Sequence, residues 1–391
     1  LKKLFKKAAF LLAAFLSYKF QMKISNIDIR LCRHSNSLMK DSEMRDGKKS
    51  DLEFLVITFD TDEGLSASTF GFAGRGASMA GEIANTIFKP FFLGRDPLYR
   101  EKNWHEYRMA DRWWNHAPIY GYGAFDVNCW LLSSLQADQP LYKYIGAYRD
   151  SIPIYGSSMI LESPEAYAKE ALEYKQKGFN AYKLHPVGKG DYDLDVECHR
   201  AVRKAVGEDF KLMSDPVASF NFEQALRFGR ELENLNFHWY EEPLYDESFH
   251  GLRELTRILD IPIIGTEILE KHPYSVAEVI STRVVDMVRA DVCMSGGITG
   301  TMKTARLAES FGVQCEITTS IYRPIDLVNL HCGAAMKNSE FFEVLVPYEY
   351  FNFGLKEEIK IEKGRALLPN KPGLGIDLDW DFIDNTTFKK L

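Results

Sequence analysis

Eight short apolar segments alternate with helical segments from Ile152 onward, and this repetition constrains the fold more than any other feature of the chain. The segments are "IPIYGSS", "NAYKLH", "KLMSD", "FHWYEE", "IPIIGTE", "DMVRAD", "QCEITT" and "FFEVLV". Strands that alternate with helices predict a parallel sheet, and eight such units over roughly 200 residues fit a (β/α)8 barrel of the TIM type. A doubly wound open sheet is the alternative, but no glycine-rich phosphate loop follows the first strand.

Capping signals mark two of the helices between these strands. Ser163 can cap the first helix, Pro164 suits its first position, and Gly178 can end it. Asn221 and Gln224 form a capping box after the third strand.

The part of the chain before the barrel has a mixed pattern. "KISNIDIRLCR" and "LEFLVITFD" are typical of strands, and "GAFDVNCWLLSSLQ" is typical of a helix. We therefore expect an N-terminal α+β capping domain at residues 22–146 and the barrel at residues 147–350. We expect residues 351–391 to form a C-terminal segment that packs back on the capping domain.

The first 21 residues combine a basic start with a short apolar run from Ala8 to Leu16. That run is too short to span a bilayer. The preferred interpretation is that folding begins near Met22, and that the leader is a misassigned start or a packing helix. A cleaved export signal and a membrane-surface helix are the alternatives.

Composition narrows the class of protein. The chain has 391 residues with 48 Lys and Arg against 55 Asp and Glu, a net charge of −7, which argues weakly against nucleic acid as a partner. The six cysteines show no paired spacing and fit reduced thiols in a cytoplasmic protein. We expect no membrane contact in the mature fold.

Three of the predicted strands end in carboxylates, and these are 26 residues apart in both steps: Asp215, Glu241 and Glu267. This spacing predicts that they lie at one level on three adjacent strands, at the carboxyl-terminal face where barrel enzymes place their active sites. Clustered carboxylates repel one another unless a cation lies between them, and oxygen ligands suit Mg²⁺. The alternative is that each acid pairs with a nearby Lys or Arg. Glu242 faces the opposite way from Glu241, so only one of the two should reach a metal.

Lys183 and His185 alternate on the second predicted strand, "NAYKLH", and should therefore point to the same side. A Lys and a His on one strand face are often only surface or core residues. Their position one strand before the three carboxylates favours a role in chemistry.

With these motifs, the chain resembles the enolase superfamily and, within it, the mandelate racemase subgroup. The segment "GAFDVNCWLLSSLQADQPLYKYIGAYRDSIPIYGS" resembles that subgroup's link between capping domain and barrel. "EEP" and "ADVCMSGGITGTMKTARLAESFGV" resemble its fourth strand end and its sixth strand with the following helix.

The resemblance implies a role for each candidate residue. Asp215, Glu241 and Glu267 match the Mg²⁺ ligands of the family. Lys183 matches the first lysine of a K-x-K motif, which helps to hold the substrate carboxylate. His185 replaces the second lysine, which removes the proton α to that carboxylate. Two positive neighbours, Lys183 and a divalent cation, would favour the unprotonated imidazole that a base requires.

The far side of the site departs from the family pattern. Asp291 matches an aspartate that in the subgroup orients a histidine at the end of the seventh strand. That histidine position falls at Thr318 or Thr319, and no histidine occurs between His272 and His331. We expect His331 to be a packed core residue.

Three further candidate site residues lie on the eighth strand and after the seventh strand. Glu343 matches an eighth-strand glutamate that donates a hydrogen bond to the substrate carboxylate when it is protonated. Tyr322 and Arg323 follow the seventh strand and could supply a second acid or an anchor.

The resemblance also implies a substrate class and a mechanism. We expect a lyase that dehydrates a sugar acid to a 2-keto-3-deoxy acid, because only one face shows a clear base. A racemase or epimerase of a hydroxy acid is the first alternative. A catalytically inactive homologue with a binding or structural role is the second. Relatives are commonly dimers or octamers, which implies a homo-oligomer, and in the capping domain residues 34–50 and 70–80 would select the substrate.

Overall fold

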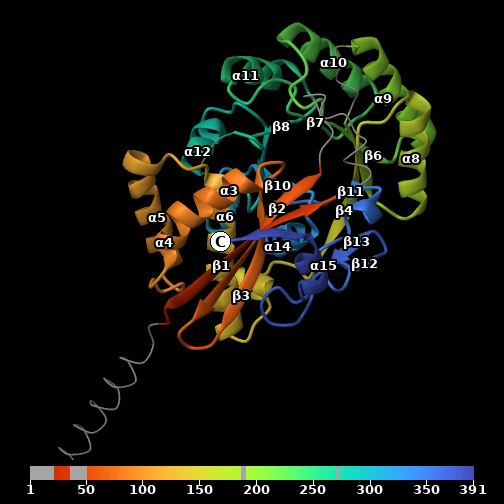
Figure 1. The fold of residues 1–391 in the computed structure, drawn as a ribbon. Coiled ribbons are helices and arrows are strands. Elements are labelled where there is room, and N and C mark those ends of the chain that lie inside the picture. Colours follow the sequence, from red (N-terminus) through yellow and green to blue (C-terminus); the bar gives the residue numbers. More distant parts are fainter. Residues whose placement is uncertain (1–21, 36–50, 186–190, 270–272) are drawn as a thin grey trace, which may run out of the picture.

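The structure is a computed structural model that describes residues 22–35, 51–185, 191–269 and 273–391. The described residues form a small antiparallel sheet and a large parallel one (Figure 1). The predicted leader and most of the polar loop at residues 34–50 lie outside the described residues. No helix among the described residues is both long and apolar enough to cross a membrane. All six cysteines are buried and free.

The small sheet is built from both ends of the chain. Its strands are β1 (Ile24–His34), β2 (Leu52–Thr61), β3 (Ser66–Phe72) and β14 (Thr387–Lys390), in the order β14-β1-β2-β3. The neighbouring strands are antiparallel, and β14 pairs with β1 through Arg30 and Lys390. The end of the chain therefore lies beside its first described strand (Figure 1). β3 was not among the strands predicted from the sequence.

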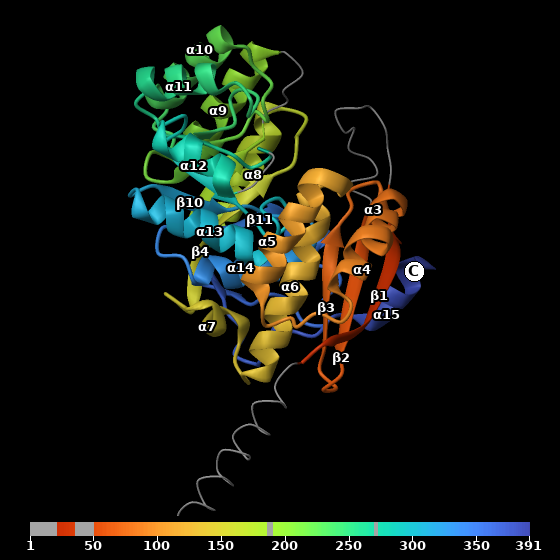
Figure 2. The ribbon, with the colours of Figure 1, turned by 90° about the vertical axis from the view of Figure 1, so that its left-hand side faces the viewer.

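Helices cover this sheet on the side that faces the barrel. They are α3 (Ala77–Ile83), α4 (Lys89–Phe92), α5 (Arg100–Ala110) and α6 (Ile119–Gln136), with π-helical turns η1 (Ala84–Phe88) and η2 (Asp111–Asn115). Figure 2 shows α6 between the small sheet and the barrel helices, where it contacts β3 on one side and α13 on the other. Gly123 on α6 allows this close approach, because a Cβ there would lie 2.3 Å from the Val292 carbonyl oxygen.

The large sheet contains the eight predicted strands. These are β4 (Ser151–Ser158), β5 (Ala181–Leu184), β6 (Lys211–Ser214), β7 (Trp239–Glu241), β8 (Ile263–Gly265), β9 (Met287–Ala290), β10 (Gln314–Ile317) and β11 (Phe342–Val346). They run parallel in chain order from β4 to β10, and β11 pairs with β4. A modified TIM-type barrel, as the sequence analysis predicts, is therefore the fold.

The two ends of the barrel sheet meet at β10 and β11, where a side chain joins them. The buried Glu316 carboxylate on β10 accepts hydrogen bonds from the backbone N–H groups of Glu340 and Phe341, at 2.8 and 3.1 Å. These contacts satisfy backbone donors just before β11.

Helices surround the barrel strands in an arc (Figure 1). They are α8 (Pro164–Gln176), α9 (Tyr192–Val206), α10 (Phe222–Asn234), α11 (Phe249–Ile258), α12 (Pro273–Ser281), α13 (Gly297–Ser310) and α14 (Arg323–Ala334). The predicted caps are confirmed: Ser163 accepts from Ala166 N–H at the start of α8, and Asn221 with Gln224 forms a reciprocal capping box on α10.

Shorter elements join and close the two parts. They are α7 (Leu141–Ile145) before the barrel, and η3 (Tyr348–Phe351), β12 (Ile361–Glu362), β13 (Arg365–Leu367) and α15 (Trp380–Thr386) after it. β13 pairs antiparallel with the start of β4, at the amino-terminal end of the barrel.

Candidate active site

Six of the seven predicted site residues come from the carboxyl-terminal ends of neighbouring barrel strands. Lys183 lies on β5 and His185 directly follows it, while Asp215 follows β6 and Glu241 ends β7. Glu267 lies two residues after β8, and Asp291 directly follows β9. Because parallel strands end at one face of a barrel, these six share that face. Glu343 is the second residue of β11 and contacts Lys183 from inside the barrel.

Four of the charged side chains inside the barrel form a closed ring. Lys183 Nζ lies 3.0 Å from Glu241 Oε2 and 3.0 Å from Glu343 Oε1. Arg289, on β9, contacts the other oxygen of each: its Nε lies 2.7 Å from Glu241 Oε1, and its Nη2 lies 2.7 Å from Glu343 Oε2. Each carboxylate therefore has one oxygen on the ammonium and the other on the guanidinium.

The ring is completely removed from solvent. The four side chains are between 0% and 2% exposed. Burial alone would lower the pKa of both Lys183 and Arg289, but Glu241 and Glu343 hold these pKa values well above their usual range. Burial would likewise raise the pKa of Glu343, yet Lys183 and Arg289 hold it far below its usual range. All three groups are therefore charged at neutral pH.

Lys183 has no hydrogen left for a substrate in this arrangement. Its third contact is with Asp215 Oδ2 at 3.2 Å, so its three N–H groups face three carboxylates. The resemblance implied that Lys183 helps to hold the substrate carboxylate. That contact would require Lys183 to leave at least one of its present partners.

The three predicted metal ligands are connected through the two cations. Lys183 bridges Asp215 and Glu241, and Arg289 bridges Glu241 and Glu267, the last contact being 3.6 Å. Among the described residues, no three His, Cys, Asp or Glu side chains already converge as a metal site. The alternative in which each acid pairs with a Lys or Arg therefore describes the contacts that these side chains make here.

The charges of this cluster nevertheless do not balance. Four carboxylates face two permanent cations, so the cluster carries two excess negative charges when all its acids are ionised; the acids are Asp215, Glu241, Glu267 and Glu343. Burial, and then repulsion from neighbouring carboxylates, raises the pKa of Glu242 and Glu267 well above their usual range. A divalent cation would supply the missing charge.

The oxygens of the cluster retain capacity for such an ion. Asp215 Oδ1 accepts from Val217 N–H at 2.9 Å, and Glu241 Oε1 accepts from Arg289. A carboxylate oxygen has two lone pairs, so each of these atoms has room for another partner. An all-oxygen donor set with a charge deficit of two suits Mg²⁺. Glu242 is placed to support the third acid, because its Oε1 accepts from Glu267 N–H at 3.1 Å.

His185 is held by the strand beside it. Its Nδ1 lies 2.6 Å from the Ser158 carbonyl oxygen, at the end of β4, and its backbone N–H donates to Ser158 Oγ at 3.0 Å. A carbonyl oxygen can only accept, so Nδ1 carries a proton. The other nitrogen, Nε2, lies 3.1 Å from Asp215 Oδ2, and the ring remains 20% exposed. Nε2 is therefore the nitrogen that can gain or lose a proton.

Asp291 is the charged residue on the far side. It is 1% exposed, its Oδ1 accepts from Met294 N–H at 2.5 Å, and its buried Oδ2 has no hydrogen-bond partner among the described residues. Burial raises its pKa to about 7. Thr318 and Thr319 stand where the family pattern would place a histidine, and both contact Glu343 Oε2, at 3.4 and 3.3 Å.

The geometry bears on three further sequence expectations. Glu343 is ion-paired with Lys183 and Arg289 in this arrangement, and in these contacts its carboxylate accepts rather than donates. Tyr322 is not available as an acid, because it is buried and its hydroxyl donates to the Glu53 carbonyl oxygen on β2 at 2.7 Å. Arg323 is buried next to Asp326, at 3.7 Å, so it is no anchor at the barrel mouth.

His331 is a packed core histidine, as expected. Its Nδ1 accepts from Tyr142 N–H and its Nε2 donates to the Leu374 carbonyl oxygen, at 3.0 and 2.9 Å.

The backbone is strained where the three acidic strands end. Positive φ angles occur at Val217 and Ala218 after β6, at Glu242 after β7, and at Thr266 after β8, with values of 50°, 55°, 37° and 76°. For β-branched residues such as Val217 and Thr266 this conformation is a true outlier. Strained residues of this kind cluster at functional sites, which supports this end of the barrel as the site.

Sequence reasoning missed Arg289. The signal was present in the segment "DMVRAD", because a charged residue inside a short apolar strand needs a buried partner of opposite charge. Its position two residues before Asp291 also placed it on the same strand face.

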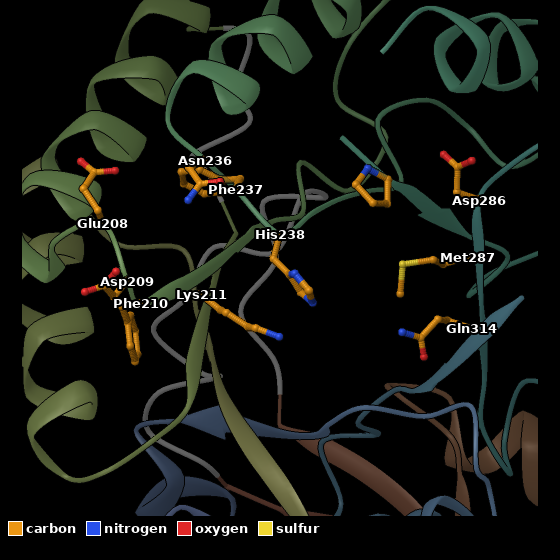
Figure 3. Close-up of a pocket in the computed structure, with 11 residues that line it drawn as sticks. Glu208, Asp209, Phe210, Lys211, Asn236, Phe237, His238, Asp286, Met287 and Gln314 are labelled. Carbon is orange, nitrogen blue, oxygen red and sulfur yellow. The ribbon is translucent and has the colours of Figure 1, made fainter. Parts of the chain in front are cut away.

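A cavity of about 600 Å³ opens at the opposite, amino-terminal end of the barrel (Figure 3). Lys211 and His238 point into it, and both contact Glu340. Burial alone would raise the pKa of Glu340, but its contacts with these two groups lower that pKa to about 2. The three side chains pair with one another at the end that barrels use for stability. The candidate site is therefore the carboxyl-terminal end.

Comparisons with known proteins show the family of the chain. The model of the family "Enolase C-terminal domain-like" matches residues 166–382. Arabinonate dehydratase from Saccharolobus solfataricus is 30% identical over 319 residues, which cover 78% of this chain and 84% of that protein. L-Ala-D/L-Glu epimerase from Bacillus subtilis is 30% identical over 244 residues, 61% of this chain and 65% of that protein.

A solved structure extends the likeness to the whole fold. The crystal structure of D-glucarate dehydratase from Agrobacterium tumefaciens, complexed with magnesium, has a TM-score of 0.85 and 29% identity, and the match covers 94% of this chain and 100% of that one. The similarity includes the capping part as well as the barrel. The chain therefore belongs to the enolase superfamily, in its mandelate racemase subgroup.

Proposed function

We propose that this protein is a Mg²⁺-dependent lyase that removes the proton α to a carboxylate and dehydrates a sugar acid to a 2-keto-3-deoxy acid. The observation that carries this proposal is the buried cluster in which four carboxylates face only two permanent cations, beside a histidine at the carboxyl-terminal end of the barrel. The arabinonate and D-glucarate dehydratases among its relatives support this substrate class.

Asp215, Glu241 and Glu267 would hold the ion, because these three acids lie at the ends of the adjacent strands β6, β7 and β8. When bound, Mg²⁺ supplies positive charge that stabilises an enediolate of the substrate carboxylate. The magnesium in the D-glucarate dehydratase structure supports the choice of metal. Lys183 would then contribute a second positive charge near the substrate carboxylate.

His185 is the proposed base, and Nε2 is its reactive atom. Ser158 fixes the proton on Nδ1, so Nε2 takes the α-proton when it is not protonated. The base form requires Asp215 Oδ2 to release Nε2 from their 3.1 Å contact. The protonated ring then gives the same proton to the β-hydroxyl as the C–O bond breaks, which releases water and leaves the enol of the 2-keto acid.

Asp291 is proposed to act on the other side of the substrate. Its unpartnered Oδ2 and its pKa of about 7 allow a carboxyl group that gives or takes a proton near neutral pH. A leaving hydroxide on that face would take its proton from Asp291, whereas one on the near face would take it from His185.

Incubation with Mg²⁺ and a panel of acid sugars, including arabinonate and D-glucarate, tests the proposal. We expect a 2-keto-3-deoxy product from at least one acid, detected as its semicarbazone or by mass spectrometry. Chelation of the metal should abolish the product. A panel that gives no 2-keto product, with Mg²⁺ bound to the protein, would contradict the assignment as a dehydratase.

Epimerisation is the second candidate, because L-Ala-D/L-Glu epimerase is among the relatives. Two-base chemistry needs a proton carrier on each face, and Asp291 would have to serve as the second one. The same incubations in deuterium oxide distinguish the two reactions. Epimerisation gives deuterium at the α-carbon without a 2-keto product, and an inactive homologue gives neither result.

A further inference from the structure

Arg289 contacts groups on several strands inside the barrel. It is 0% exposed, and besides Glu241 and Glu343 its guanidinium donates to the Ile317 carbonyl oxygen at 3.1 Å and to the Tyr155 hydroxyl at 3.2 Å. These partners belong to β7, β11, β10 and β4. One side chain therefore fixes groups on four other strands.

The geometry requires a guanidinium rather than another cation. Nε binds Glu241 while Nη2 binds Glu343, and Nη1 binds a backbone carbonyl, so three different nitrogens of one plane face three acceptors. An ammonium is a single point on a flexible chain and cannot hold both carboxylates in this way.

The ring shows what Arg289 does for the other residues. Glu241 and Glu343 each have one oxygen on Arg289 and one on Lys183. If Lys183 turns toward a substrate carboxylate, Arg289 still neutralises and orients both acids from the barrel interior. Without Arg289, two buried carboxylates would have only Lys183 as a common partner, and Lys183 would be held to them.

We propose that Arg289 is the positioning residue of this site, which holds Glu241 ready as a metal ligand and leaves Lys183 free to bind the substrate carboxylate. This inference rests on the proposed function. Arg289 would act through the acids that it contacts, because its own side chain is completely buried.

Calorimetric titration with Mg²⁺ in the absence of substrate tests the inference. We compare the wild type with Arg289→Lys, which retains the charge, and with Arg289→Met, which retains only the length. Groups that orient a metal ligand typically change metal affinity by about 10- to 100-fold when they are replaced. We expect Kd to rise by about 10-fold or more in both variants, and more in Arg289→Met.

Arg203→Met is the matched control. Arg203 is also buried and donates to five backbone carbonyls near the amino-terminal end of the barrel, including those of Leu235 and Phe210. Its loss should lower the melting temperature and leave the Mg²⁺ Kd unchanged. If Arg289→Met does not fold, Arg289→Lys, with its retained charge, still provides the comparison.

The outcomes separate the two proposals. A wild type that binds Mg²⁺ and folded Arg289 variants that bind it equally well would overturn the role of Arg289 alone. A wild type that does not bind Mg²⁺ would overturn the proposed function, together with the inference that rests on it. Weaker binding in both Arg289 variants, with an unchanged Kd in Arg203→Met, supports the inference.

Discussion

Lys183 and His185 lie side by side because they alternate on one strand, but their surroundings give them different properties. Lys183 is completely buried among three carboxylates, whereas the His185 ring is 20% exposed and contacts one carboxylate and one carbonyl oxygen. Only His185 is therefore open to an approaching C–H group. This difference supports assigning proton transfer to His185 and charge stabilisation to Lys183.

Replacement of His185 with Asn tests this assignment. The asparagine amide would retain a polar group near Ser158 but cannot accept a proton at neutral pH, so we expect turnover to fall by at least about 100-fold, the usual contribution of a general base. The Mg²⁺ Kd should change by less than about threefold, because the proposed ligands are unchanged. Asp215 loses its contact with Nε2 but keeps its contacts with Lys183 and with the Val217 N–H. Activity assay and calorimetry on the same preparation give both values.

His238→Asn is the control for this experiment, because His238 lies at the opposite end of the barrel and contacts Glu340. That variant should remain active. Residual turnover of His185→Asn close to that of the wild type would show that another group removes the proton.

At the scale of elements, the strands β6, β7 and β8 end in backbone that only a few residue types adopt readily. Val217 has φ of 50° and is an exposed residue, so its strain is not explained by packing of the side chain. The Val217 N–H donates to Asp215 Oδ1 at 2.9 Å. The strained turn therefore orients a proposed metal ligand, as strained backbone at functional sites often does.

Val217→Asn should therefore stabilise the protein. Asn adopts positive φ more easily than a β-branched residue, and we expect the free energy of unfolding to rise by about 1 kcal/mol. The backbone N–H that orients Asp215 is retained, so the Mg²⁺ Kd should not change. Denaturant unfolding of the wild type, Val217→Asn and Val217→Ala measures the effect.

Val217→Ala separates strain from loss of side-chain contacts, because Ala lacks the β-branch but gains no special preference for positive φ. A Val217→Asn variant that is no more stable than Val217→Ala would contradict the explanation by backbone strain.

The same elements show what sequence could predict. The eight barrel strands and the capped starts of α8 and α10 follow from local patterns, which need only neighbouring residues. β3 was missed because its sequence, "SASTFGF", is rich in small and polar residues and acquires its strand form by pairing with β2.

The sequence predicted which residue types would lie in the candidate site, but it could not predict which of them contact one another. The even spacing of Asp215, Glu241 and Glu267 indicated which strand ends would carry acids. The ring could not be predicted, because Arg289 meets Glu241 and Glu343 only after three distant strands have closed around it. The lowered pKa of Glu343 depends on the same contact and therefore could not be predicted either.

At the scale of the whole molecule, His331 connects three parts of the chain that are far apart in sequence. It lies on α14 of the barrel, accepts from Tyr142 N–H at the start of α7, and donates to the Leu374 carbonyl oxygen in the C-terminal segment. Both contacts need the neutral ring, because Nδ1 must accept while Nε2 donates. Burial lowers the pKa of His331 to about 4.

This coupling predicts a specific dependence of stability on pH. The unfolded chain protonates His331 below its ordinary pKa of 6.5, whereas the folded protein does so only near pH 4. Acidification through this window therefore favours the unfolded state, and the contribution of His331 is complete above pH 6.5 and lost as the pH falls toward 4. The difference between the two pKa values corresponds to about 3 kcal/mol.

Replacement of His331 with Phe isolates this contribution. At pH 7 the variant leaves the Tyr142 N–H and the Leu374 carbonyl unsatisfied, and we expect it to be less stable by about 2 to 4 kcal/mol. At lower pH the wild type loses the stabilisation that the neutral His331 ring provides, which the variant lacks at every pH. The difference in unfolding free energy between the two proteins should therefore shrink by about 3 kcal/mol between about pH 6.5 and 4.

His199, whose pKa burial also lowers to about 4, is present in both proteins and cancels in the comparison. Denaturant titrations of both proteins at half-unit pH steps measure the difference, and a gap that stays constant from pH 7 to pH 4 would mean that His331 does not connect the barrel to the C-terminal segment as a neutral ring.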